Sequence, residues 1–301
     1  MVKQFRIIIG TMSTCLAVCL ALLPIQTSGQ ASPPPTAVAA AQSYGFTDAE
    51  IEKVLQGDVL TKALEEGSTK ELAGVAAIRL PVPVTEFADV ALEGKLLRLD
   101  SSIRSLSVWK PEEPADKAFA DLQVDAAQQA MFKGRYEAYR KKGLAGIVPY
   151  ARGERNAGSP GELLALAIKE TRSLERRLGY AEALLNFPAD PLPGMEHRFF
   201  AYEQKVEGLR TFILSHRAAV RGEHHALITE QRYYVSNTYA CRFIATDCFE
   251  VPGGTLVFYV SRIFTDQVAG VGTRLKHVIG RGRMLAKVAA NLKRDREQLK
   301  K

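Results

Sequence analysis

The sequence predicts an α+β fold in which an antiparallel sheet curves around one long C-terminal helix. Between residues 197 and 264, apolar and polar residues alternate with the two-residue period of strands. From residue 271 onward, apolar residues recur every three or four positions, as in an amphipathic helix. Residues 126–186 also have a helical pattern, and we expect them to form an insertion that packs over the sheet.

The first 31 residues have the order of a secretory signal peptide. Lys3 and Arg6 precede an apolar run that ends near Leu23, and small and polar residues follow. This run is short for a membrane span, which needs roughly 20 apolar residues. We therefore expect cleavage and a periplasmic or secreted protein. A lipoprotein anchor at Cys19 is less favoured, because Val18 occupies a position where lipoproteins carry a small residue.

The remaining chain is predicted to be a flexible Pro- and Ala-rich linker, residues 32–43, followed by a single domain, residues 44–301. The domain opens with a short helix, for which Thr47 is the N-cap, Glu50 its capping-box partner and Gly57 the stop.

The next elements are a strand, a helix and then the antiparallel strands. Residues 75–80 are apolar on both faces, which is typical of a central strand, and Pro83 and Gly94 bracket a helix. Turn residues divide the later region into four predicted strands: 197–206, 209–218, 225–245 and 254–264.

The C-terminal helix carries the positive charge of the protein. The chain has a net charge of +7, and residues 274–301 contain ten Lys or Arg against Asp295 and Glu297, a net +8. Gly280 and Gly282 lie in the middle of this helix, so we expect a close neighbour or a bend there. Export favours an anionic membrane surface over nucleic acid as partner for the basic face. A solvated outer helix face explains the same charges without a partner.

This order of elements resembles the helix-grip order of START and polyketide-cyclase-like proteins. The resemblance rests on GVAAIRLPVPVTEFADV, on GGTLVFYVSRIFTD and on the final helix. The segments YEAYRKKGLAGIVPYARG, LLNFPADPLPG and RYYVSNTYACRFIA resemble an uncharacterised family of exported bacterial proteins. The helix-grip resemblance implies a cavity between a curved sheet and the terminal helix, filled by an apolar ligand. It supplies no catalytic residues.

The candidate cavity residues lie on the predicted strands, where aromatic rows are interrupted by single polar groups. Such rows are typical of a pocket wall, and equally of a plain core in which Asn237 bonds to backbone. Arg262 needs a carboxylate partner, an anionic ligand or a route to water. A lone histidine such as His216 is more often a hydrogen-bonded structural residue. The candidates are Tyr233, Asn237, Tyr239, Phe243, Phe258, Arg262 and His216.

Catalytic, metal and cofactor sites have little support in the sequence. No nucleophile elbow or dinucleotide-binding loop is present, and we predict no cofactor. Glu223, His224 and His225 are types that bind zinc, but adjacent residues on a strand point apart and the spacing matches no zinc motif.

Cys241 and Cys248 are the remaining cysteines once the signal peptide is removed, and export permits a disulfide between them. A continuous strand would hold them roughly 23 Å apart and on opposite faces, too far for a bond. An oxidised pair therefore predicts a bend near residues 245–247, and two free thiols predict one long strand.

The sequence thus favours an exported protein that binds or carries a hydrophobic or amphipathic small molecule or lipid. The alternative is a cell-envelope structural or interaction protein with no cavity, whose basic helix meets membrane or a partner. A hydrolase or cyclase using His216 with Arg262 is a third class, for which the sequence suggests no substrate.

Overall fold

The computed structural model describes residues 36–120, 122–150, 159–175 and 177–300. The chain divides into two units, Met1–Ala31 and Ser32–Lys301, and all described residues belong to the second. The predicted signal peptide and Cys19 lie outside the described residues. None of the helices in the described part of the chain is long and apolar enough to span a membrane.

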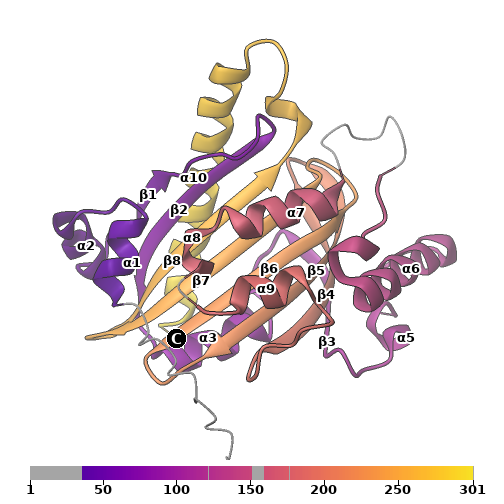
Figure 1. Cartoon of the computed structure of the whole chain (residues 1–301), viewed down its shortest axis with the longest axis horizontal. Helices are drawn as coiled ribbons and strands as arrows, with labels where there is room; N and C mark the ends of the chain where they lie inside the picture. The colour runs from indigo at the N-terminus through magenta and orange to yellow at the C-terminus, as the bar shows by residue number, and fades with distance from the viewer. Residues whose placement is uncertain (1–35, 121, 151–158, 176, 301) are drawn as a thin grey trace, which may run out of the picture. The chain divides into compact units, whose positions relative to one another are not determined.

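An eight-stranded antiparallel sheet forms the centre of the fold (Figure 1), in the order β1-β2-β8-β7-β6-β5-β4-β3. The sheet is open, with β1 and β3 at its edges. This arrangement, together with the C-terminal helix, confirms the predicted α+β class. The strands are β1 (Leu60–Ala63), β2 (Glu71–Leu80), β3 (Ile103–Trp109), β4 (Glu196–Val206), β5 (Leu209–Arg221), β6 (His225–Val235), β7 (Cys241–Val251) and β8 (Gly254–Phe264).

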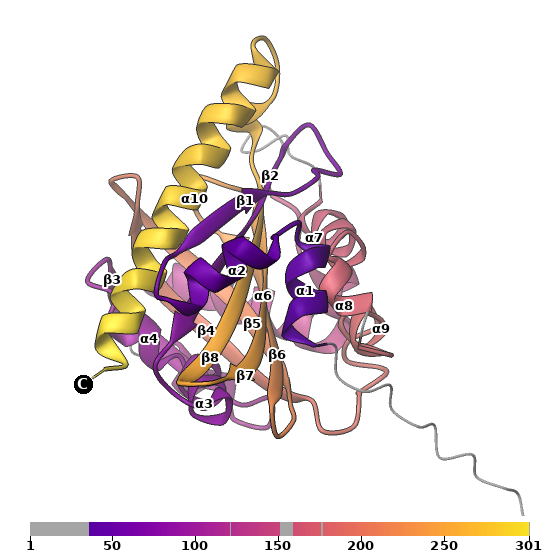
Figure 2. The same ribbon diagram turned by 90° about the vertical axis from the view of Figure 1, so that its left-hand side faces the viewer.

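Helices cover both faces of this sheet (Figure 2). One face packs against α1 (Ala37–Ser43), α2 (Asp48–Leu55), α6 (Ala126–Lys142), α7 (Pro160–Lys169), α8 (Arg172–Glu175) and α9 (Tyr180–Leu185). The other packs against α3 (Val84–Leu92), α4 (Lys95–Arg98) and α10 (Thr273–Gln298). The short elements α5 (Ala115–Ala118), η1 (Gly143–Gly146) and η2 (Asp266–Val268) complete the described fold. We call the first face the helical-layer face and the second the α10 face.

The N-terminal part of the unit agrees with its capping signals but not with a linker. Thr47 and Glu50 form the predicted capping box at the start of α2. Residues 37–43, which the sequence analysis assigns to a flexible linker, instead form α1, capped by Thr36. Ala40 and Ala41 are buried, because their small side chains let this helix lie against the core.

The predicted strand 225–245 is wrong: it is two strands, β6 and β7, joined by a turn at residues 236–240. Thr238 adopts a φ of 72° in this turn. The run contains no glycine or proline, and its weaker turn signal is the cluster of Ser236, Asn237 and Thr238. Because β6 pairs antiparallel with β7, the turn creates a strand pair that the sequence analysis did not contain.

A β-bulge in β6 reverses the alternation of its side chains. Leu214 on β5 pairs with Tyr234, but the next residue, Ser215, pairs with Arg232. Tyr233 is therefore the extra residue of a bulge. As a result Tyr233 and Tyr234 both belong to the helical-layer core, and Val235 lies on the α10 face.

The two cysteines are free thiols, so the structure does not contain the candidate disulfide between Cys241 and Cys248. Both lie on β7, which runs straight through the region where a bend was considered. Each is fully buried, Cys241 in the helical-layer core and Cys248 on the α10 face. The strand that holds them is β7 alone, rather than the one long strand that free thiols were expected to indicate.

The two central glycines of α10 have different surroundings. A Cβ on Gly280 would meet Leu72 Cδ1 at 3.1 Å and Val268 Cγ1 at 3.3 Å, whereas a Cβ on Gly282 would meet nothing within 4 Å among the described residues. The expectation of a close neighbour in this part of the helix is therefore confirmed, and the neighbours lie at Gly280 rather than at Gly282.

Gly282→Ala should stabilise the protein by roughly 0.5 to 1 kcal/mol, because alanine is the better helix former and the added methyl enters open space. Gly280→Ala should gain less, since Leu72 and Val268 must move. Urea denaturation of the two variants checks this, and an equal gain for both would contradict it.

Candidate functional site

A cavity of about 470 Å³ lies between the sheet and α10. This volume falls within the roughly 300–1,000 Å³ of small-molecule pockets. Its walls come from strands β2, β4 to β8 and from helices α3, α4 and α10. Much of the lining is apolar and includes Leu80, Phe87, Ile228, Ile244, Ile263, Met284, Val288 and Leu292.

An ionic cluster occupies the cavity wall formed by β5 and β6. Glu230 accepts hydrogen bonds from Arg217 Nε and Nη2 at 2.9 and 2.7 Å, and from Arg232 Nε at 2.8 Å. All three residues are buried. Burial by itself would raise the pKa of Glu230, but the charges of Arg217 and Arg232 hold that pKa well below its usual range. Glu230 is therefore ionised.

Arg242 on β7 faces the cavity directly opposite Arg232 in the register of the sheet. Its guanidinium donates to Ser261 Oγ at 3.1 Å and is 3.4 Å from the hydroxyl of Tyr259. Both acceptors are neutral. Among the described residues no carboxylate forms an ion pair with Arg242, so its positive charge faces the cavity uncompensated.

Further cations line the cavity where α10 meets solvent. Arg283 and Lys287 are exposed residues of its lining. The residues that line the cavity include seven Lys or Arg and four acids, a net charge of +3; the acids are Asp100, Glu207, Glu230 and Asp295. The cavity therefore combines apolar walls with an excess of positive charge.

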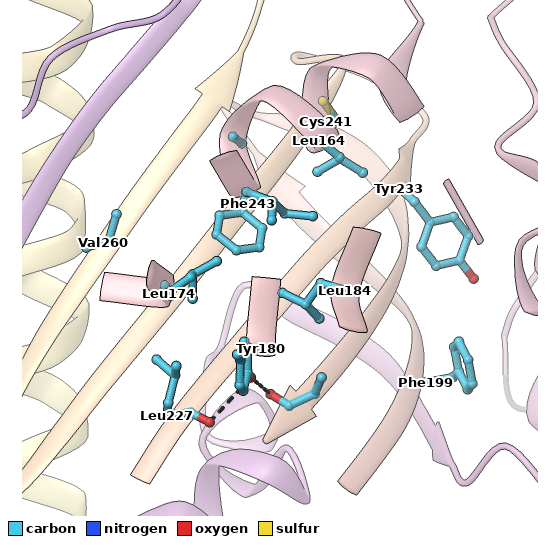
Figure 3. Packing of buried hydrophobic residues seen from close by; sticks show 14 of the residues in the cluster. Leu164, Leu174, Tyr180, Leu184, Phe199, Leu227, Tyr233, Cys241, Phe243 and Val260 are labelled. Carbon is cyan, nitrogen blue, oxygen red and sulfur yellow. Dashed lines mark hydrogen bonds between the residues drawn. The ribbon is translucent and has the colours of Figure 1, made fainter. Parts of the chain in front are cut away.

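Three of the residues predicted to line a cavity lie instead in the helical-layer core, and Figure 3 shows two of them, Tyr233 and Phe243. Phe243 and Phe258 are fully buried there. Tyr233 stacks on Tyr139 of α6, with ring centroids 4.2 Å apart. These three side chains do not line the cavity under α10. The sheet has helices on both faces, and these aromatic side chains pack on the helical-layer face, where Phe258 contacts Tyr44 and Phe46.

Arg262 is buried on the helical-layer face and has a protein partner. Its Nη1 lies 2.6 Å from a carboxylate oxygen of Glu71, and its Nη2 donates to the carbonyl of Glu170 at 2.7 Å. Of the alternatives raised by the sequence, a protein carboxylate is the one observed. Arg262 does not line the α10 cavity.

His216 has structural partners on both ring nitrogens. Nδ1 lies 2.8 Å from the hydroxyl of Tyr139, and Nε2 lies 2.9 Å from Nδ1 of His197. Burial, followed by the effect of His197, lowers the pKa of His216 well below its usual value, so this imidazole is neutral. Since β5 and β8 are separated by β6 and β7, His216 and Arg262 lie roughly 14 Å apart, too far to act together.

The two remaining candidates come from the β6–β7 turn. The side-chain amide of Asn237 donates a hydrogen bond to the carbonyl of Arg210 at 2.7 Å. This is the bond to backbone that the sequence analysis considered as one alternative. Tyr239 lines the α10 cavity and receives a hydrogen bond from Arg232 at 3.1 Å. Both also line a second, more polar pocket beside Tyr150 and Tyr234. Tyr239 is thus the one candidate that reaches the α10 cavity.

The described residues contain no gathering of three or more metal-ligand side chains. His224 contacts Glu250, and the adjacent His225 contacts Asp247 at 2.6 Å. The two histidines therefore have different carboxylate partners, as their positions on a strand suggest.

The sequence reasoning missed the ionic cluster of Arg217, Glu230, Arg232 and Arg242. A signal for it exists: Ile228, Glu230 and Arg232 share one face of β6, and Arg242, Ile244 and Thr246 share one face of β7. Charged residues within an otherwise buried row of a central strand need partners. The sequence analysis placed the candidate cavity on the aromatic face of these strands, so it did not consider the charged row on the opposite face.

Comparisons of the chain with protein-family models, curated proteins and solved structures give no match. The functional argument therefore rests on the geometry of the cavity.

Glu230→Gln should lower the free energy of unfolding by roughly 3 to 5 kcal/mol, because it leaves two buried guanidinium groups without their carboxylate. Chemical denaturation measures the loss. The matched control is Glu137→Gln, which removes a partly exposed ion pair with Arg140 and should cost about 1 kcal/mol or less. Similar losses for the two variants would show that the cluster is not held by Glu230.

Proposed function

We propose that this protein is an exported carrier that binds a hydrophobic or amphipathic small molecule or lipid between the sheet and α10. The observation that carries the proposal is the 470 Å³ cavity with apolar walls. Its position between a sheet and the C-terminal helix is where helix-grip proteins would hold a ligand, and the element order resembles theirs. The predicted signal peptide supports a periplasmic or secreted location.

Filling the cavity should abolish binding of an apolar probe. Thr246 is buried on β7 and lines the cavity, so Thr246→Trp places an indole ring inside it. The fluorescence of N-phenyl-1-naphthylamine, a neutral apolar dye, should rise on binding the unaltered protein and stay near its level in buffer with the variant. Circular dichroism establishes that the variant is folded.

The matched control is Tyr233→Phe, on the opposite face of the sheet. The Tyr233 hydroxyl is buried and has no hydrogen-bond partner among the described residues, so its removal should leave both folding and dye binding unchanged. The proposal fails if the unaltered protein does not bind the dye and yields no lipid on extraction. It also fails if a folded Thr246→Trp protein binds the dye as before.

The competing function, contact with an anionic membrane surface, is favoured by one observation on the first turns of α10 and the residues before it. Val271, Leu275, Val278 and Ile279 are exposed, with Val271 at 96% and Leu275 at 66%. Their spacing of three and four residues places Leu275, Val278 and Ile279 on one helix face. Arg274, Lys276 and Arg283 lie beside them in sequence. Exposed apolar residues flanked by cations are typical of helices that lie in the membrane interface.

A double variant, Leu275→Glu with Val278→Glu, should reduce co-sedimentation with vesicles containing phosphatidylglycerol, because it removes apolar area and adds negative charge. Leu178→Glu is the control, since Leu178 is 90% exposed between α8 and α9 on the helical-layer side of the sheet. The membrane function is contradicted if both variants lose vesicle co-sedimentation equally, or if the unaltered protein does not bind vesicles.

A further inference from the structure

We propose that the ligand of the α10 cavity carries an anionic head group, a carboxylate or a phosphate, and that the guanidinium of Arg242 binds it. This inference rests on the proposed carrier function and adds the chemical class of the ligand. An aliphatic chain would lie along the apolar walls and its head at the ionic cluster of β6 and β7.

The first argument is the cross-strand pair of Arg232 and Arg242. These residues are direct partners in the register of β6 and β7, and both line the cavity. Like charges directly opposite each other destabilise a sheet. Partial burial strengthens the repulsion, because apolar surroundings screen charge less than water does. An anion placed against this pair would remove the cost.

The second argument is that Glu230 has no capacity left for Arg242. Its Oε2 accepts two hydrogen bonds from Arg217, and its Oε1 accepts from Arg232 and, at 3.3 Å, from the hydroxyl of Tyr202. The two carboxylate oxygens thus already hold four hydrogen bonds, about the number a carboxylate accepts. Arg217, Glu230, Arg232 and Arg242 together carry a net charge of +2.

The other acids of the cavity wall are either paired with another arginine or exposed to solvent. Asp100 and Asp295 each pair with Arg294, at 3.3 and 3.0 Å. Glu207 is exposed in the turn between β4 and β5. No carboxylate among the described residues is therefore available to neutralise Arg242.

A comparison with Arg262 shows an arginine whose charge is paired with a carboxylate of the protein itself. Arg262 donates to the Glu71 carboxylate and to two backbone carbonyls, those of Glu65 and Glu170. Arg242 reaches two neutral hydroxyls, and its Nη1 has no hydrogen-bond partner among the described residues. Guanidinium groups bind carboxylates and phosphates with paired donors, so Arg242 fits such a head group.

The cations beside the solvent-exposed part of the cavity support the same ligand class. Arg283 and Lys287 are exposed lining residues, and no ion pair neutralises either one among the described residues. Positive charge around a cavity attracts anions and speeds their association. Positive charge is thus present both at the exposed lining of the cavity and among the buried and half-buried arginines of the sheet.

Displacement of bound N-phenyl-1-naphthylamine by dodecyl compounds tests the head-group preference, because the chain length is constant. Dodecanoate or dodecyl phosphate should displace the dye at a concentration at least roughly tenfold below that needed for dodecan-1-ol, since a charge-assisted hydrogen bond is stronger than a neutral one. Which of the two anions competes better separates a carboxylate from a phosphate ligand.

Arg242→Gln should reduce this preference to about twofold or less while dodecan-1-ol competes as before. Arg242→Lys keeps the charge, is the variant less disturbing to the fold, and should retain part of the preference. Arg140→Gln, at a partly exposed arginine of α6 on the other face of the sheet, is the control and should change nothing.

The outcomes separate this inference from the carrier function itself. If dodecan-1-ol competes as well as both anions, or if Arg242→Gln leaves the preference intact, the head-group assignment is overturned and the apolar cavity stands. If neither the dye nor any dodecyl compound binds the unaltered protein, the carrier function fails and the assignment fails with it.

Discussion

Both faces of the eight-stranded sheet are covered by helices, and this constraint governs where nearly every strand side chain goes. On β6, all eleven residues from His225 to Val235 are buried. A strand with one wet face can place its charged residues in water. Here Arg217, Glu230 and Arg232 lie on the α10 face, and Arg262 with Glu71 lies on the helical-layer face, so each group needs a partner inside the protein.

The two faces are filled in different ways, and the difference produces the cavity. Several short helices on the helical-layer face follow the shape of the sheet, and aromatic rings such as Tyr139, Tyr180 and Phe199 complete a dense core (Figures 1 and 3). On the α10 face the 26-residue helix α10 packs on β1 and β2, and the shorter α3 packs on β5 and β6 (Figure 2). A long helix touches a twisted sheet along part of its length only. The space left beside it is lined by Ile244, Met284 and the arginines.

The ionic groups of the two faces differ in how completely they are neutralised. Arg262 and Glu71 form a pair of opposite charges that needs no further ion. On the α10 face one carboxylate, Glu230, serves two arginines, and Arg242 is left with hydroxyl partners. Such an excess of buried and half-buried positive charge is costly without a bound anion. The same excess of positive charge is useful in a protein whose ligand supplies the missing negative charge.

The sequence by itself determined the α+β class, the capping box of α2, the hairpin turns at Gly208 and Pro252 and the long C-terminal helix, since these depend on local periodicity and on residues with strong backbone preferences. Tertiary structure decided which face of each strand meets which layer. The bulge at Tyr233 and the turn at Thr238 carry no Gly or Pro signal, and each changes the alternation that the sequence analysis used. Arg242 therefore lines the cavity and Phe243 lies in the core. The alternation of a strand places these two side chains on opposite faces of the sheet, but it does not determine which helices cover each face.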